Sequence, residues 1–242
     1  MTKIDILDRS SMTERLNRGL VIDRRETAIV TIDMHRGHLD PAVATLPTSP
    51  EDARRVIAAA KDVLDFARER GVPVVHVKQV YRRLPNWRNE GMSQPFWQAM
   101  QTLLAEDNRL SPGRRTRLED HQIEGSPGTE TIPEVYAEGD YTIDNKKRLD
   151  CFYGTDLRLL LDNLGAKTIC LMGINTNTCV LNTSFTAFNF NYRVVVLSDC
   201  VASMYGDDLH ALGLQNVARC LGWVIDNRTF KDKLDAGAGR NS

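Results

Sequence analysis

Short apolar runs alternate with amphipathic segments along most of this chain. The runs are rich in β-branched residues and too short for helices, which is typical of strands buried in a sheet. The amphipathic segments repeat apolar residues at helical spacing, and the first of them begins at the N-cap Ser49 and ends at Gly71. The expected strands are 27–33, 73–78, 141–146, 167–172, 193–198 and 223–226, and the later expected helices are 94–105, 155–164, 179–191 and 207–221.

Strands that alternate with helices predict an α/β fold with three layers, α/β/α and Rossmann-like, around a mostly parallel sheet of about six strands. We expect an N-terminal arm over residues 1–26 and a single domain over 27–242. The stretch 79–139 is the least regular part and is expected to be an insertion. Its aromatic residues Trp87, Phe96 and Trp97 are candidates for a lid or a subunit contact.

Composition and charge narrow the function classes. A net charge of −1 over 242 residues gives no global field that selects nucleic acid or a membrane, and the basic run at 113–117 is interpreted as a solvated loop. No apolar run is long enough to span a membrane, and the first residues do not resemble a signal peptide. The five cysteines have irregular spacings without a CxxC pair, which favours reduced thiols in a cytoplasmic protein.

Three ionisable residues stand at the carboxyl ends of expected strands. Asp33 ends the first strand, Lys146 ends the third, and Cys179 follows the fourth at the start of a helix. In a parallel sheet these ends lie along one edge, where ligands bind. We therefore expect the three side chains to meet there.

This set of residues suits nucleophilic catalysis. A helix N-terminus and a nearby ammonium group favour the thiolate form of Cys179, and Asp33 can carry a proton between the thiol and a leaving amine. Lys146 keeps the carboxylate ionised and stabilises negative charge. Taken singly, each residue has an ordinary alternative, since most cysteines are small buried hydrophobes and strand-end charges are usually solvated.

The chain also resembles a family, the isochorismatase-like cysteine hydrolases, which include N-carbamoylsarcosine, ureidoacrylate, biuret and maleamate amidohydrolases and the nicotinamidases. The resemblance runs from about Thr27 to Asp226. It is carried by VTIDM at 30–34, KKR at 146–148, YGTDL at 153–157 and GINTNTCV at 173–180. It implies an Asp–Lys–Cys triad, which falls on Asp33, Lys146 and Cys179.

The resemblance further implies a cis Ile174–Asn175 peptide and an oxyanion hole made by the backbone N–H groups of Asn175 and Cys179. The implied reaction is cofactor-independent acyl transfer. Cys179 attacks a small amide, ureide or N-carbamoyl compound, ammonia or an amine leaves, and water hydrolyses the thioester. It also implies a homo-oligomer, either a dimer or a tetramer.

Two departures from the family pattern bear on the substrate. His35 stands where the family commonly has glutamine, so it either contacts substrate or is bonded within its loop. The stretch after the second strand lacks the histidine and aspartate pattern that binds metal in nicotinamidases, so no metal is expected. Further candidates for substrate contact are Arg148, Phe152, Asn177 and Thr178.

Other interpretations remain open at this point. An aryl or heteroaryl carboxamide hydrolase is favoured if the insertion supplies an aromatic wall. A non-catalytic member of the family would bind a ligand with an inert Cys179. A thiol redox protein would need a resolving cysteine, for which Cys151 is the candidate.

Overall fold

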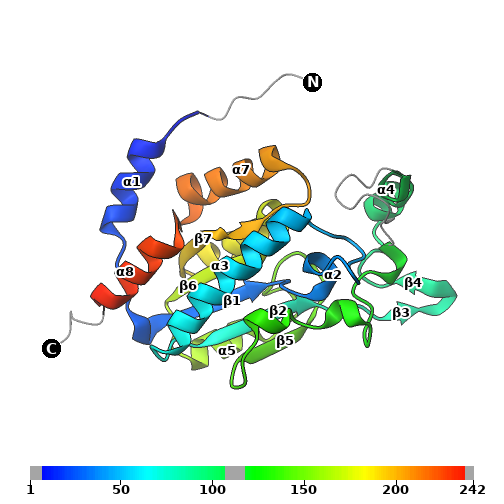
Figure 1. The fold of residues 1–242 in the computed structure, drawn as a ribbon, viewed down its shortest axis with the longest axis horizontal. Helices are drawn as coiled ribbons and strands as arrows, with labels where there is room; N and C mark the ends of the chain where they lie inside the picture. Colours follow the sequence, from blue (N-terminus) through cyan, green and yellow to red (C-terminus); the bar gives the residue numbers. More distant parts are fainter. Residues whose placement is uncertain (1–6, 107–117, 238–242) are drawn as a thin grey trace.

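The computed structural model describes residues 7–106 and 118–237. The basic run 113–117 and the side chain of Trp87 lie outside the described part. A six-stranded parallel sheet forms the centre, in the order β5-β2-β1-β6-β7-β8, with β1 and β6 in the middle (Figure 1). The strands are β1 (Thr27–Ile32), β2 (Val74–Gln79), β5 (Tyr141–Lys146), β6 (Thr168–Ile174), β7 (Arg193–Ala202) and β8 (Trp223–Ile225).

Helices cover both faces of this sheet, which confirms the expected three-layer α/β/α fold. One face packs against α3 (Pro50–Arg68) and α8 (Asn227–Gly237), which bury apolar residues such as Val63 and Phe230. The other face packs against α5 (Leu157–Asn163), α6 (Leu181–Asn189) and the turn that follows α7 (Asp207–Asn216). Ala28 and Ile29 of β1 point into opposite cores, as adjacent residues of a strand must.

Most of the predicted helices and strands begin and end within a few residues of the observed boundaries. Helix α3 begins after its N-cap Ser49, whose hydroxyl accepts a hydrogen bond from the Asp52 amide, and the chain leaves it through Gly71 at φ +70°. Between β1 and α3, where no helix or strand was expected, the chain forms the short helix α2 (Arg36–Leu39). The expected helix 207–221 is α7 followed by one wider turn over Val217–Leu221.

The remaining elements lie at the two ends of the sheet. Helix α1 (Ser10–Gly19) packs beside β8, where the Asn17 side chain donates to the Val224 carbonyl. At the opposite end, Figure 1 shows α2, α4 (Pro95–Glu106) and the hairpin of β3 (Arg83–Leu84) and β4 (Arg88–Asn89) gathered beyond the strands. The segment expected as an insertion therefore covers the carboxyl ends of the sheet.

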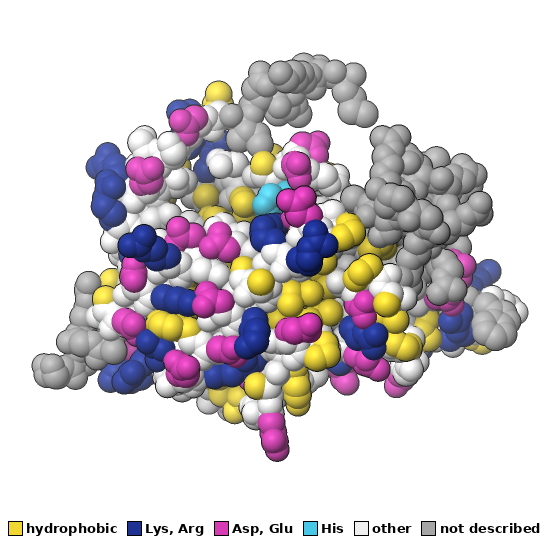
Figure 2. Space-filling view, viewed as in Figure 1, with side chains coloured by type: hydrophobic (Ala, Val, Ile, Leu, Met, Phe, Trp, Pro, Cys, Tyr) yellow, Lys and Arg dark blue, Asp and Glu magenta, His cyan; other side chains and the backbone are white. Residues whose placement is uncertain are grey.

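The surface carries charges of both signs. Figure 2 shows Lys and Arg side chains interspersed with Asp and Glu over the face in view, in keeping with the net charge of −1. No helix in the described ranges combines the length and the apolar character needed to cross a membrane.

Candidate active site

Three strand ends bring Asp33, Lys146 and Cys179 together. Asp33 follows β1, Lys146 is the last residue of β5, and Cys179 lies between β6 and α6. The Lys146 Nζ atom is 2.5 Å from Asp33 Oδ2 and 3.4 Å from Cys179 Sγ. Lys146 and Asp33 are fully buried, and Cys179 is almost fully buried. The ammonium group is therefore in contact with both a carboxylate and a thiol.

The backbone around Asp33 fixes the direction of its carboxylate. Asp33 has φ +52°, a left-handed conformation that is uncommon for residues other than glycine. Its second oxygen, Oδ1, accepts a hydrogen bond of 2.9 Å from the amide of Gln79, at the end of β2. The strand that separates β1 from β5 thus orients the aspartate while the lysine reaches it from β5.

The end of β6 approaches β1 very closely. Gly173 has φ +121°, and a Cβ atom there would lie 2.0 Å from the carbonyl oxygen of Ile32. Just beyond Gly173, the peptide bond between Ile174 and Asn175 is cis. The Asn175 side-chain oxygen accepts a hydrogen bond from the amide of Met204. These contacts tie the chain before the thiol to both neighbouring strands.

The helix that carries the thiol begins earlier than expected. Residues Thr176–Val180 form one wide turn that continues directly into α6, so Cys179 lies in its first turn rather than at its first residue. The carbonyl of Asn175 accepts from the amides of Thr178 and Val180. The first-turn geometry still directs the helix N-terminus toward the site.

Burial and charge act in opposite directions on the protonation of Cys179. Burial raises the pKa of the thiol to about 12, and the positive charge of Lys146 offsets this only in part. Burial alone would lower the pKa of Lys146, but the charge of Asp33 outweighs it and raises that pKa above its usual range. Burial of Cys179 therefore opposes the thiolate form that the sequence pattern favours, while the neighbouring Lys146 ammonium supports it.

The thiol opens into a cavity of about 540 Å³. Asn175 and Thr178 lie beside Cys179 on its wall, and aromatic side chains from the segment 79–139 and from the loop after β7 form much of the rest. These aromatic residues are Tyr81, Phe96, Trp97 and Tyr205. The cavity is large enough for a small organic molecule.

The other residues proposed for substrate contact fall into two groups. Arg148 and Thr178 line the cavity. His35 is fully buried, with its Nε2 atom 3.9 Å from Asp33 Oδ1. Phe152 packs in the core against Phe190, and Asn177 accepts a hydrogen bond from the Ser203 hydroxyl, so neither lines the cavity.

Sequence reasoning missed two histidines on the cavity wall, His38 and His121. His38 stands one helical turn after His35, which is the signal that was available for it. His121 lies within the segment 79–139, and nothing in its neighbours in sequence connects it to the site. Within the described ranges, no group of histidine, cysteine, aspartate or glutamate side chains is arranged to hold a metal ion.

Comparisons with known proteins found chains that are similar over most of their length. The chain is 25% identical over 223 residues to the ureidoacrylate amidohydrolase RutB of Agrobacterium fabrum, covering 85% of this chain and 88% of that protein. It is 25% identical over 218 residues to the maleamate amidohydrolase of Pseudomonas putida, covering 89% and 90%. A cysteine hydrolase from Pseudomonas syringae pv. phaseolicola has the same fold, with a TM-score of 0.73, 20% identity and coverage of 90% and 96%.

The family assignment rests on a match that spans most of the chain. The model described as the isochorismatase domain matches residues 27–229, which include the entire sheet and the residues of the candidate active site. The chain belongs to the isochorismatase domain family.

Proposed function

We propose that this protein is a cofactor-independent cysteine amidohydrolase that cleaves a C–N bond of a small linear amide, ureide or N-carbamoyl compound. The observation that carries the proposal is the position of Lys146, whose Nζ atom contacts both Asp33 and Cys179 beside the cavity. The names of the relatives, a ureidoacrylate and a maleamate amidohydrolase, support the same reaction class.

The first half of the reaction forms a thioester. Cys179 Sγ attacks the substrate carbonyl carbon while its proton passes to Asp33, and Lys146 stabilises the negative charge on sulfur. The backbone N–H groups of Asn175 and Cys179 stabilise the oxyanion. The tetrahedral intermediate collapses, the C–N bond breaks, and Asp33 gives its proton to the departing nitrogen, so ammonia or an amine leaves.

The second half restores the enzyme. Asp33 takes a proton from water, the resulting hydroxide attacks the thioester, and the C–S bond breaks with the proton returned to Cys179. The raised pKa of the resting thiol explains why a base is needed next to it. Proton transfer to Asp33 during attack takes the place of a thiolate formed in advance.

Of the residues near the cavity, Arg148 and Thr178 are proposed to contact the substrate. Arg148 is exposed, donates through Nη1 to the carbonyl of Lys147 and lines the cavity. His35 is proposed to act on Asp33 rather than on substrate, since it is fully buried.

A second candidate is an aryl or heteroaryl carboxamide hydrolase. The cavity wall contains the aromatic residues Tyr81, Trp97 and Tyr205, which favour this candidate. Stacking of a substrate ring on an aromatic side chain contributes a modest favourable free energy of binding.

A homo-oligomer, either a dimer or a tetramer, is also part of the proposal. Phe185 and Phe188 of α6 are each nearly half exposed and offer an apolar surface for it. Light scattering after gel filtration measures the mass of the particle.

The function is tested by ammonia release from a panel of biuret, ureidoacrylate, N-carbamoyl amino acids, maleamate, nicotinamide and benzamide. We expect one class to be hydrolysed by the wild type and none by Cys179→Ser. Cys220 is the exposed cysteine, so Cys220→Ser is the matched control and should retain full activity. Hydrolysis that survives in Cys179→Ser would refute the mechanism.

A matched labelling experiment separates a wrong panel from a wrong function. In the Cys220→Ser protein, iodoacetamide should modify Cys179 in preference to the other three cysteines, because Cys179 lines the cavity and they do not. A reactive Cys179 without turnover means that the substrate is missing from the panel. An inert Cys179 without turnover favours a non-catalytic binding protein.

A further inference from the structure

Three buried imidazoles extend from the aspartate to the cavity wall. His35 Nε2 lies 3.9 Å from Asp33 Oδ1, and the His35 and His38 rings stack with centroids 4.8 Å apart. The ring of His121 follows, 5.0 Å from that of His38. His38 and His121 line the cavity, whereas His35 does not. The proposed reaction assigns no role to His38 or His121.

The hydrogen bond of His38 fixes which of its nitrogens faces a ligand as an acceptor. Its Nδ1 atom is 2.6 Å from the carbonyl oxygen of Leu46, and because a carbonyl only accepts, Nδ1 carries the proton. A neutral ring then has a lone pair on Nε2. Burial lowers the pKa of His38, so the ring is neutral at pH 7 and Nε2 is an acceptor.

His121 offers a second polar atom, Nε2, which can donate or accept because the Thr45 hydroxyl that pairs with Nδ1 can itself accept or donate. Its Nδ1 atom pairs with the Thr45 hydroxyl at 2.9 Å, and its backbone carbonyl accepts from the Asn89 side chain at 2.6 Å. Its Nε2 atom is buried and has no hydrogen-bond partner in the part of the chain that the structure describes. A buried polar atom without a partner destabilises the protein. A ligand group that pairs with it removes this penalty, which makes the free energy of binding more favourable.

We propose that His38 and His121 determine specificity by pairing with an amide or ureido group of the substrate, beyond the carbonyl that Cys179 attacks. The N–H of this group donates to His38 Nε2. His121 Nε2 pairs with the same group, whose N–H and carbonyl suit either tautomer of that ring. This inference rests on the proposed amidohydrolase function for the position of that carbonyl. The substrates that fit are neutral diamides and ureides. A carboxylate in the same place has no proton to donate, and it would face the lone pair of His38 Nε2.

Arg148 supports the opposite preference. It lies at the same cavity and is a natural partner for a carboxylate, so a substrate held by Arg148 alone would be an acid rather than an amide. A preference for the diamide and a preference for the acid are distinguished by one measurable quantity. It is the ratio of activity on an amide to activity on the acid of equal length.

The test uses two such pairs, succinamide with succinamate and malonamide with malonamate, at two chain lengths. The wild type should prefer the diamide in at least one pair. His38→Asn keeps a donor near the Leu46 carbonyl and removes the acceptor at Nε2, so it should lower the diamide-to-acid ratio of kcat/KM about tenfold, mainly through KM. His38→Gln, which places an amide near the Nε2 position, should recover part of the ratio.

His121→Asn provides an independent variant. It keeps a polar group near Thr45 and removes Nε2, and it should lower the same ratio without changing the ratio of nicotinamide to benzamide turnover. Melting temperatures of all variants identify any that fail to fold. A wild-type preference for the acids, or ratios that His38→Asn and His121→Asn both leave unchanged, would overturn the proposal.

Binding separates this inference from the proposed function. Protection of Cys179 from iodoacetamide in the Cys220→Ser background reports occupancy of the cavity without turnover. Suppose that no compound is hydrolysed but succinamide or malonamide protects Cys179. If His38→Asn then raises the concentration needed for half-maximal protection about tenfold, the histidine subsite stands and the hydrolase function fails. Absence of protection by all four compounds, together with absence of turnover, counts against the subsite.

Discussion

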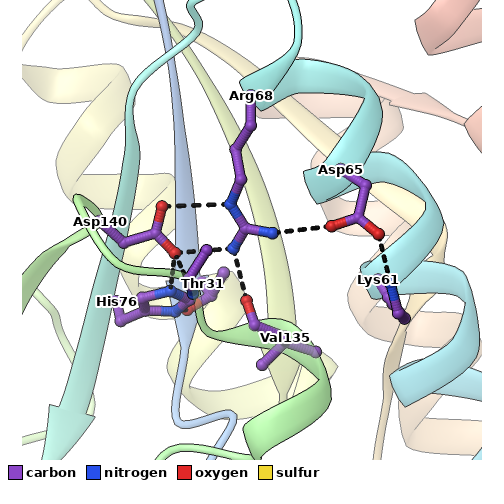
Figure 3. Close-up of polar contacts among 8 residues, drawn as sticks. Thr31, Lys61, Asp65, Arg68, His76, Val135 and Asp140 are labelled. Carbon is purple, nitrogen blue, oxygen red and sulfur yellow. Dashed lines mark hydrogen bonds and ion pairs between the residues drawn. The ribbon is translucent and has the colours of Figure 1, made fainter.

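Two buried polar clusters lie on the sheet, and they contain similar chemical groups. One is Asp33, Lys146 and Cys179 at the strand ends. The other lies in the body of the sheet, where the Thr31 hydroxyl is 2.7 Å from His76 Nδ1 and His76 Nε2 is 3.0 Å from Asp140 Oδ2 (Figure 3). A hydroxyl, an imidazole and a carboxylate in this order are the groups of a serine-type triad.

The two clusters differ in what surrounds them. Arg68 binds both oxygens of Asp140 and also donates to the carbonyl of Val135, so the carboxylate of the second, closed cluster is paired within the protein (Figure 3). Thr31 is 1% exposed, and none of the four side chains lines the active-site cavity. Cys179, by contrast, opens into that cavity. Suitable residue types therefore do not identify an active site unless a substrate can reach them.

The largest effect is expected from removing the base of the open cluster. Asp33→Asn keeps the acceptor for the Gln79 amide but loses the group that receives the thiol proton. We expect kcat to fall about 10³-fold or more. Asp140→Asn, the matched change in the closed cluster, should leave kcat within about twofold of the wild type. Equal losses of kcat in the two variants would contradict the distinction between the clusters.

Acid should destabilise the two regions in different pH ranges. Burial lowers the pKa values of His35, His38 and His121, so these rings stay neutral in the fold but gain protons when unfolded. Stability should therefore fall as the pH drops below about 6.5, by at most about 1 kcal/mol for each histidine between pH 7 and 5.5. Urea denaturation at these pH values measures it.

Asp140 provides the contrast. Burial opposes ionisation of its carboxyl, but hydrogen bonds from His76 and Arg68 lower its pKa to about 2. A carboxylate with a lowered pKa stabilises the fold at neutral pH and loses that contribution only as the pH falls from about 4 toward 2. His121→Asn should make the decline between pH 7 and 5.5 shallower, whereas Asp140→Asn should leave it unchanged. The reverse result would show that the loss of stability between pH 7 and 5.5 arises from the closed cluster and not from the three histidines.

A smaller effect is expected from opening the closed cluster. Arg68→Met removes the partner of a carboxylate that is 6% exposed in its side chain, and we expect the free energy of unfolding to fall by about 2 kcal/mol. Because no substrate reaches Asp140, kcat should stay unchanged. Arg55→Met, on the same helix, removes a more exposed arginine and serves as the control. A loss of kcat in Arg68→Met beyond the loss of folded protein would show coupling between the clusters.

The smallest effect is expected at Thr31. Thr31→Val conserves the shape of the side chain and removes the hydroxyl that pairs with His76, which should lower the free energy of unfolding by about 1 kcal/mol. Chemical denaturation measures this, with Thr31→Ser as the variant that keeps the hydroxyl. If Thr31→Val instead abolished ammonia release while remaining folded, the closed cluster would have a catalytic role.

The sequence allows the fold and the strand-end cluster to be predicted for one physical reason. In a parallel sheet, every strand delivers its last residue to the same edge, so Asp33 is located by finding where the apolar run of β1 stops. The strand β5 is mostly polar, and Lys146 at its end is located with the help of the family motif KKR. The protonation of Cys179 was not predictable in this way, because it depends on burial by segments far along the chain. The same holds for the cavity wall, since His121 reaches it through the packing of the irregular segment 79–139.

Phe152 illustrates the limit for aromatic residues. Its place shortly after the lysine motif is compatible with a cavity wall, yet its ring packs against Phe190 and Tyr192 in the core. Both partners come after α6 in the chain, and no local pattern connects them to Phe152. Which face of a loop an aromatic residue occupies is decided by such distant partners.

Gly173 has a consequence for engineering new specificities. Because any side chain at this position would collide with the carbonyl oxygen of Ile32, a substitution must push β6 away from β1. Asp33 follows one of these strands and the loop to Cys179 follows the other, so the separation would widen the gap between base and nucleophile. A saturation library at residue 173 should therefore return glycine alone among active clones. Libraries aimed at new substrates belong on the cavity wall, where shape can vary while the distance between the two strands is kept.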